Sequence, residues 1–143
     1  MRPLPLQTLT VRTTARNEMV EVTDRLRKMI GTYNIVEGML VVYVPHTTAA
    51  VTINENADPD VKSDMLLKLS TLVPQRETYY RHAEGNSDSH VKAAMVGSSV
   101  TVLIEAGKLV LGRWQGVYFC EFDGPRQREL HVKAVKFAPP ESD

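Results

Sequence analysis

Hydrophobic and polar positions in the first half of the chain repeat with two different periods. Between residues 4 and 13, apolar and polar side chains alternate as they do in a half-buried β-strand. Residues 39–44 form an almost continuous apolar run, MLVVYV, which predicts a strand that is buried on both faces. Between these segments, apolar residues recur at the spacing of a helix that ends near Gly31, namely Val22, Leu26, Met29 and Ile30.

A second helix follows a short strand in which Val51 and Ile53 alternate with polar residues. Asp58 is a residue type favoured at the N-cap, and Pro59 suits the first helical position because the N–H that proline lacks has no helical partner there. We expect this helix to end before Pro74. Its apolar stripe consists of Val61, Met65, Leu69 and Leu72.

Strands dominate the second half of the chain. A polar loop over residues 78–89 leads into one or two helical turns that end at Gly97. Apolar segments separated by short turns then predict strands in antiparallel order, at residues 99–105, 108–111, 116–122 and 128–137. In the last strand the apolar phase shifts after Ala134, so we expect a β-bulge or a sharp twist there.

These elements predict an α+β fold with two mostly antiparallel sheets in a sandwich-like arrangement and two main helices. The length of 143 residues is typical of one domain, so we assign residues 1–143 to a single domain. Lysine plus arginine and aspartate plus glutamate number 17 each, and the formal net charge of zero excludes the strongly basic surface of a typical nucleic-acid-binding protein. No apolar run approaches the roughly 20 residues of a membrane-spanning helix.

The single cysteine and the N-terminus bear on the cellular compartment. Cys120 has no second cysteine with which to form an internal disulfide, and the N-terminal residues lack the apolar stretch of a signal peptide. We therefore expect a cytoplasmic protein. Because Cys120 lies within an apolar strand, we interpret it as a packing residue rather than a nucleophile.

Four segments contain more histidine, carboxylate and arginine side chains suited to binding or catalysis than folding requires. In the first, His46 follows the most apolar strand, where a histidine either presents a ring nitrogen to a cleft or bonds to the backbone at the rim of a sheet. In the second, Glu55 stands in a turn that does not favour glutamate, which leaves a functional carboxylate or a solvated charge as alternatives. The neighbouring Asn56 and Asp58 suit turn and cap positions.

The third segment, residues 82–90, combines His82, Glu84 and His90 around a conformationally free glycine. Histidine and carboxylate side chains are zinc ligands, although the His-x7-His spacing matches no standard zinc motif. The alternative is a polar surface loop that caps the following helix through Asp88 or Ser89.

The fourth segment surrounds the only tryptophan, Trp114, and continues at residues 123–128. Arg126 and Arg128 are two positions apart on a predicted strand, so they point to the same face and can bind a phosphate group together. A charged face in contact with solvent is the alternative. Arg113 lies beside Trp114 at a turn, where an aromatic side chain can form the wall of a pocket. The sequence contains no P-loop, no Cys-x-x-Cys pair and no G-x-S-x-G elbow.

These segments, read together, resemble the sequence blocks of the YjbQ-like proteins. The blocks are HTTAAVTINENADPDV, HAEGNSDSHVKAAMVGSS and GKLVLGRWQGVYFCEFDGPRQREL, and the likeness extends from about residue 5 to residue 137. A secondary thiamine-phosphate synthase activity has been attributed to this family. The resemblance implies an α+β fold with two sheets, a homotrimer, and a cleft in which His46, Glu55, His82 and His90 converge.

The resulting hypothesis is an enzyme that acts on a phosphorylated small molecule. A divalent metal would be held by His46, His82 and His90, and zinc is favoured over magnesium because histidines outnumber carboxylates in these segments. Glu55 or Glu84 would orient the ligands or act as a general base. The phosphate-binding residues would be Arg113, Arg126 and Arg128. For a thiamine-phosphate synthase, the metal and the arginines would stabilise the pyrophosphate as it departs.

Two other functions are compatible with the same residues. The cleft could bind a small anion or a phosphorylated metabolite without transforming it, or it could hydrolyse a substrate with a metal-bound water. A ligand that raises the melting temperature without turnover would indicate the binding module. Cleavage of phosphate esters that a chelator abolishes would indicate the hydrolase. We expect neither nucleic acid nor a membrane as a partner.

Overall fold

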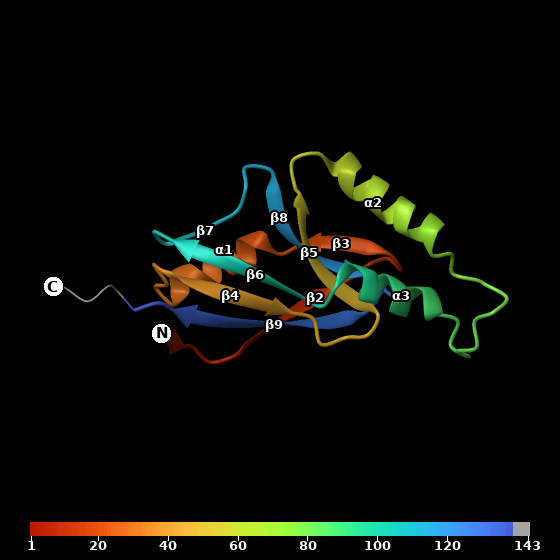
Figure 1. Ribbon diagram of the computed structural model, residues 1–143, viewed down its shortest axis with the longest axis horizontal. Helices are drawn as coiled ribbons and strands as arrows, with labels where there is room; N and C mark the ends of the chain where they lie inside the picture. Colours follow the sequence, from red (N-terminus) through yellow and green to blue (C-terminus); the bar gives the residue numbers. More distant parts are fainter. Residues whose placement is uncertain (139–143) are drawn as a thin grey trace.

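The structure is a computed structural model that describes residues 1–138, and within them it contains two antiparallel sheets and three helices (Figure 1). Sheet A comprises β1 (Arg2–Pro3), β2 (Gln7–Arg12), β4 (Gly38–Tyr43), β6 (Ser99–Glu105), β7 (Lys108–Leu109) and β9 (Gln127–Lys136). Sheet B comprises β3 (Glu18–Glu21), β5 (Ala49–Glu55) and β8 (Gln115–Glu121). The helices are α1 (Thr23–Thr32), α2 (Pro59–Leu72) and α3 (Ser87–Val96).

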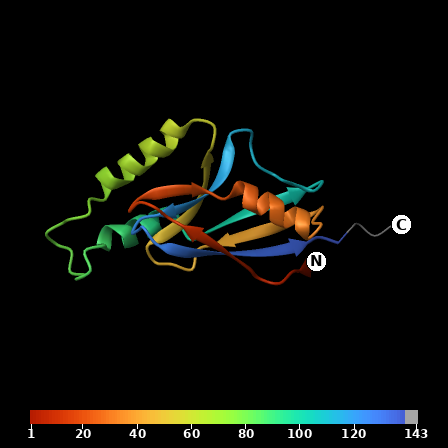
Figure 2. The same cartoon turned by 180° about the vertical axis from the view of Figure 1, so that it is seen from behind.

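Strand pairing within both sheets is antiparallel throughout, which confirms the predicted α+β class with two antiparallel sheets. Sheet A has the order β1-β9-β4-β6-β7, with β2 also paired to β9, and sheet B has the order β3-β8-β5. Helices α2 and α3 lie at the opposite end of the molecule from the N-terminus and α1 (Figure 2). The single domain is predicted to span residues 1–143, and its last five residues lie outside the described part of the chain.

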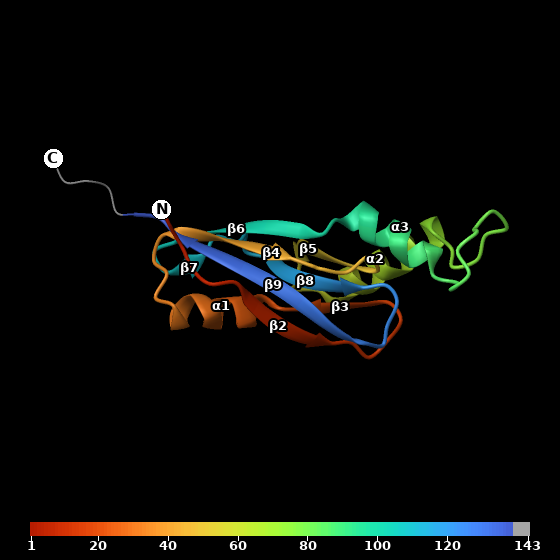
Figure 3. The same cartoon turned by 90° about the horizontal axis from the view of Figure 1, so that it is seen from below.

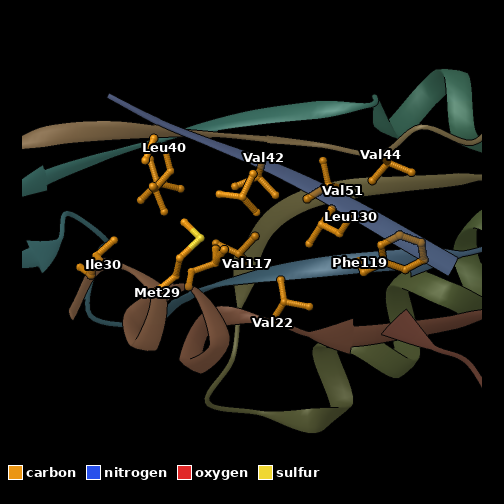
Figure 4. Close-up of a cluster of buried hydrophobic side chains, with 14 of the residues drawn as sticks. Val22, Met29, Ile30, Leu40, Val42, Val44, Val51, Val117, Phe119 and Leu130 are labelled. Atoms are coloured by element: carbon orange, nitrogen blue, oxygen red, sulfur yellow. The ribbon is translucent and has the colours of Figure 1, made fainter. Parts of the chain in front are cut away.

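The main hydrophobic core lies between the two sheets and α1 (Figure 4). Seen from below, α1 and β3 lie on the opposite side of this core from β4 and β6 (Figure 3). Helix α1 contributes Leu26, Met29 and Ile30, as its periodicity predicts, and the sheets contribute residues such as Val42 and Phe119. Burial of these large apolar side chains supplies the main driving force for packing the two sheets together.

A second apolar cluster covers the outer face of sheet B, beneath α2 and α3. Strand β8 is therefore buried on both faces from Gly116 to Glu121. Cys120 lies in this cluster, and burial raises the pKa of its thiol to about 12. A thiol with that pKa is protonated at neutral pH, which supports the packing interpretation of this residue.

The apolar run in β4 is buried on one face only, so the prediction of burial on both faces is wrong. Leu40 and Val42 face the core at 0% exposure, whereas Met39 and Val41 are half-buried and Tyr43 is 46% exposed. The reason is that sheet B covers one face of sheet A, and no helix within residues 1–138 covers the other face.

The irregularity predicted for the last strand occurs in its partner instead. Strand β9 pairs with β4 without interruption. On its other edge, Pro3 pairs with Val135 and Gln7 with Val132, so the N-terminal strand takes four steps while β9 takes three. Of the strand predicted at residues 4–13, residues 7–12 form β2, and the extra residue separates β2 from β1, which lies before the predicted strand. Strand β3 was not predicted, because four residues with charged ends form a strand only by pairing with β8.

Helix α2 begins as the sequence predicts, with Pro59 in its first turn and the Asp58 side chain accepting a hydrogen bond from the Asp60 N–H at 2.9 Å. Its apolar face is shifted from the predicted stripe. Leu66 packs on sheet B together with Met65 and Leu69, whereas Leu72 is 57% exposed. Helix α3 is longer than the predicted one or two turns. None of the helices within residues 1–138 combines the length and the apolar character that crossing a membrane requires.

A buried ion pair joins the two sheets at the end that carries α3. Arg128 of β9 donates to Glu121 of β8, from Nε to Oε1 at 2.9 Å and from Nη2 to Oε2 at 2.5 Å. Thr13 donates to the same carboxylate at 2.7 Å, and Arg128 Nη2 donates to Thr48 Oγ1 at 2.8 Å. Burial alone would raise the pKa of Glu121, but the hydrogen bonds from Arg128 and Thr13 outweigh it, so the pKa lies below the ordinary value of 4.5.

We therefore predict an acid-sensitive contribution of Glu121 to stability. Since the folded-state pKa is depressed, the stabilisation is complete above pH 4.5 and is lost as the pH falls through the lower folded-state pKa. Glu121→Gln should lower the free energy of unfolding at pH 7 by about 3–5 kcal/mol, because it leaves a buried guanidinium without its counter-charge. The difference from the wild type should shrink toward pH 3 in urea titrations.

Glu105→Gln, at the exposed end of β6, is the matched control and should change stability little at either pH. A stability difference between the wild type and Glu121→Gln that is the same at pH 7 and pH 3 would contradict the assignment.

Candidate functional site

An open cleft of about 430 Å³ lies where three loops meet beside α3. One loop follows β4, the second precedes α3, and the third connects β8 to β9. Six of the eight predicted site residues line this cleft, namely His46, His82, Glu84, His90, Arg126 and Arg128. Segments that are up to eighty residues apart in the sequence thus contribute to one surface.

The other two predicted site residues, Glu55 and Arg113, lie elsewhere. Glu55 ends β5 and pairs with Gln115 at the start of β8, while β5 begins just after the cleft residue Thr48. Because β5 is extended, its six residue steps carry Glu55 about 20 Å from the cleft (Figure 1). The guanidinium of Arg113 stacks over the Trp114 ring at 4.6 Å, at the same far end. The implied convergence of Glu55 with the histidines is therefore wrong within one chain.

His46 is held as a neutral hydrogen-bond donor. Its Nε2 accepts a hydrogen bond from the backbone N–H of Glu129 at 3.0 Å, so the proton of the neutral ring resides on Nδ1. Burial lowers the pKa of His46, and the positive charge of Arg128 lowers it further. The ring is consequently uncharged at neutral pH and has one N–H available.

His82 and His90 lie side by side across the cleft. Their ring centroids are 5.5 Å apart and the rings meet edge to face, with an interplanar angle of 88°. The Nε2 atom of His82 is 3.7 Å from a carboxylate oxygen of Glu84. The loop that carries His82 and Glu84 is exposed, whereas His90 is half-buried on α3. These three residues form the side of the cleft that the loop before α3 and α3 itself provide.

Arg126 and Arg128 each use one side of the guanidinium for protein contacts and leave the other free. Arg126 donates from Nε to the Asp123 carbonyl at 2.7 Å and from Nη2 to the Asp123 carboxylate at 2.8 Å. Arg128 donates from Nε and Nη2 to Glu121 and Thr48. Within residues 1–138, neither Nη1 atom has a hydrogen-bond partner in the protein, and both residues line the cleft. Two directed donors are thus available to a ligand.

Asn86 is a cleft residue that the sequence reasoning missed. Its side chain is only 6% exposed, and Nδ2 donates to the Asp123 carboxylate at 2.8 Å. That carboxylate requires a donor, which assigns the amide orientation and directs Oδ1 away from it. Among the buried side-chain atoms of residues 1–138, Oδ1 of Asn86 is the one without a hydrogen-bond partner. The sequence signal was the polar loop itself, but an unpaired atom is visible only in three dimensions.

Helix α3 is anchored by buried charges on the side away from the cleft. Asp88 is 0% exposed and accepts two hydrogen bonds from Arg16, both at 3.0 Å, and one from Lys92 at 3.2 Å. Burial raises the pKa of Asp88, but the bonds from Arg16 and Lys92 outweigh it and lower the pKa overall. Ser89 donates to the Phe122 carbonyl at 2.5 Å. Asp88 and Ser89 therefore dock α3 onto the sheet rather than cap it, and they fix the directions of Asn86 and His90.

The donor types in the cleft suit zinc, but the described side chains do not converge as a metal centre. Zinc accepts imidazole and carboxylate ligands, which His82, His90 and Glu84 provide. Within residues 1–138, however, no three histidine, cysteine, aspartate or glutamate side chains are close enough to hold one ion together. His46 could join such a set only by giving up its bond from Glu129 or its Nδ1 proton.

Comparisons with known proteins agree with the fold and the sequence blocks. The family model described as UPF0047 protein YjbQ-like matches residues 7–137. The UPF0047 protein YugU of Bacillus subtilis is 48% identical over 130 residues, which cover 91% of this chain and 98% of that protein. A UPF0047 protein of Methanocaldococcus jannaschii is 49% identical over 125 residues, which cover 87% of this chain and 90% of that protein.

Solved structures give the same result. The crystal structure of a YjbQ/UPF0047 family protein from Clostridium acetobutylicum has a TM-score of 0.88 at 46% identity, covering 90% of this chain and 99% of that one. A protein of Sulfolobus solfataricus has a TM-score of 0.89 at 27% identity, covering 95% of this chain and 99% of that one. The first is described as uncharacterised and the second as of unknown function. With the match spanning both sheets and every cleft residue, the chain belongs to the UPF0047 family of YjbQ-like proteins.

Proposed function

We propose that this protein is an enzyme whose cleft binds a phosphorylated small molecule and acts on it by acid–base catalysis. The observation that carries the proposal is the Nη1 group of Arg128, a charged donor that has no hydrogen-bond partner among residues 1–138, on a guanidinium that Glu121 and Thr48 hold rigidly. A fixed, planar guanidinium matches the geometry of phosphate oxygens, because it donates in defined directions and loses little freedom on binding.

Neighbouring groups extend the site for an anion. Nη1 of Arg126 and the Nδ1–H of His46 are two further donors in the same cleft. Asp123 and Glu121 offset the charges of Arg126 and Arg128, so recognition relies on directed hydrogen bonds rather than on an excess of positive charge. A compact phosphate or pyrophosphate group is the ligand that such a set of donors fits.

The acid–base role falls to His82, Glu84 and His90. Imidazole and carboxylate groups commonly act as general acids and bases, so His82, with a Glu84 oxygen 3.7 Å away, can deliver a proton to a leaving oxygen or take one from a nucleophile. The Nδ1–H of His46 can stabilise negative charge that develops on the leaving group. The reaction class is transfer or hydrolysis with departure of a phosphate or pyrophosphate.

Thiamine-phosphate synthesis is one reaction of this class. In that reaction the thiazole nitrogen attacks the pyrimidine methylene, a C–N bond forms, and the C–O bond to pyrophosphate breaks. The donors of the cleft fit the departing pyrophosphate. The family descriptions name no such activity. The proposal therefore covers the class of phosphorylated small molecules and not this particular pair of substrates.

Pyrophosphate binding tests the anion site directly. Arg126→Ala should weaken the binding of inorganic pyrophosphate about tenfold or more in isothermal titration calorimetry, because it removes charged hydrogen bonds and leaves Asp123 without its counter-charge. Arg113→Ala removes an equally charged side chain at the far end of sheet B and should leave the affinity unchanged. Equal affinities for the two variants would contradict the site, as would a wild type that does not bind.

Turnover separates the enzyme from the binding module and the metal-dependent hydrolase. The wild type should release phosphate from one or more members of a panel of phosphate esters, and His90→Gln should lose that release while still binding pyrophosphate. Binding without release would indicate the binding module. Release that a chelator abolishes would indicate the hydrolase.

As the alternative to acid–base catalysis by these side chains, we propose that a divalent metal, zinc rather than magnesium, binds at His82, Glu84 and His90 after they move together. Elemental analysis of protein purified without a metal-affinity tag should find near-stoichiometric zinc in the wild type and only traces in a triple variant of His46, His82 and His90. His131→Gln, on the outer face of sheet A, should retain the metal. Equal traces in all three proteins would overturn this proposal.

We also propose that the protein forms a homotrimer through the outer face of sheet A. This face presents Tyr43 at 46% and Leu103 at 53% exposure, beside the half-buried Met39 and Val41. Met39 pairs directly with Leu103, so the apolar residues form a continuous surface across β4 and β6. Apolar patches of this kind are commonly covered by a protein partner.

The mass in solution tests the trimer. The wild type should have three times the chain mass of 16.0 kDa, about 48 kDa, in light scattering coupled to size exclusion. Leu103→Lys should reduce the mass toward 16.0 kDa, because three copies of a charge would be buried at the interface. Leu67→Lys, at a 68% exposed position of α2, is the control and should leave the mass unchanged. A wild type of 16.0 kDa would contradict the assembly.

A further inference from the structure

A second hollow of about 360 Å³ adjoins the cleft, and the phosphate chemistry makes no use of it. His46, Thr47 and His90 line both spaces, so the two hollows share a border. The remaining wall differs in character from that of the cleft. It is formed by small side chains, namely Ala49, Ala93, Ala94, Gly97 and Ser98.

The hollow follows from how α3 crosses the start of β5. Helix and strand pack together through Ala93 and Ala50, and the buried Ala49 and Ala93 that line the hollow are too short to fill it. Gly97 ends the helix at a φ of 104°, a conformation that other residues rarely adopt, so no side chain projects from this position. Larger residues at these positions would close the hollow.

Unsatisfied polar atoms in the adjoining cleft indicate that a ligand completes the site. The Nη1 groups of Arg126 and Arg128, two residues that line this cleft, have no hydrogen-bond partner among residues 1–138. A phosphate group that accepts hydrogen bonds from these two arginines lies beside the shared border at His46 and His90.

We infer that the ligand carries a compact apolar group, such as an aromatic ring, which occupies the hollow while its phosphate binds Arg126 and Arg128. This inference rests on the proposed anion site and specifies the substrate class as phosphate esters of apolar alcohols or phenols. The methyl groups of Ala93 and Ala94 supply apolar surface to the hollow, and the imidazoles of His46 and His90 belong to the border that it shares with the cleft. Transfer of the apolar group from water to this surface stabilises the complex in proportion to the area buried.

Two esters of equal charge separate the hollow from the anion site. Phenyl phosphate should bind the wild type about tenfold more tightly than methyl phosphate in isothermal titration calorimetry. Ala94→Leu should abolish this preference and leave the affinity for methyl phosphate unchanged, because the longer side chain fills the hollow without reaching the arginines. Ala94 is exposed, so the substitution does not disturb the core. Ser98→Leu, at a second exposed position of the same wall, should act in the same way.

Ala57→Leu, at an exposed alanine just before α2, is the matched control and should retain the tenfold preference. Equal wild-type affinities for the two esters would overturn the inference and leave the anion site standing, whereas failure of both esters to bind would overturn the proposed function. A matching loss of both esters in Ala94→Leu would also contradict a separate apolar hollow. One further result would contradict the inference, namely a wild type without an ester preference together with a changed oligomeric mass of Ala94→Leu. A second copy of the chain, rather than a ligand, would then fill the hollow.

Discussion

The ion pair between Glu121 and Arg128 is the interaction on which both the fold and the site depend. It connects β8 of sheet B to β9 of sheet A, and Thr13 and Thr48 complete its hydrogen bonds. Taking two charges out of water is unfavourable, so such a pair persists where its geometry and its further hydrogen bonds are good. Arg128 also lines the cleft. The contact that joins the two sheets therefore also fixes the position of a cleft residue.

A second buried charge cluster does the same for α3 on the opposite wall. Arg16 and Lys92 hold Asp88, which lies between the cleft residues Asn86 and His90 along the helix. The two clusters have the same consequence, because each uses protein charges to fix the direction of groups that face the ligand. Preorganisation of this kind reduces the ordering that binding would otherwise require.

Charge compensation also limits which ligands the cleft accepts. Each cleft arginine has its own carboxylate, Asp123 for Arg126 and Glu121 for Arg128, and the whole chain has a formal net charge of zero. A long polyanion gains little from such a surface, since its binding depends on many uncompensated cations. A small molecule gains from a few well-directed donors and, under our inference, from the adjoining apolar hollow.

The sequence by itself determined the features that depend on neighbouring residues: the α+β class, the cap of α2 at Asp58 and Pro59, and the loops that carry His46, His82 and His90. The alternation of apolar residues and the spacing of cap residues are properties of a single helix, strand or loop, so the local sequence is sufficient to predict these features. The tertiary structure alone decided that Glu55 lies a strand's length from the histidines and that β4 is buried on one face. It also decided the role of Asp88, whose partner Arg16 is 72 residues away. Contacts over such distances form only when both sheets have packed, and no local pattern encodes that geometry.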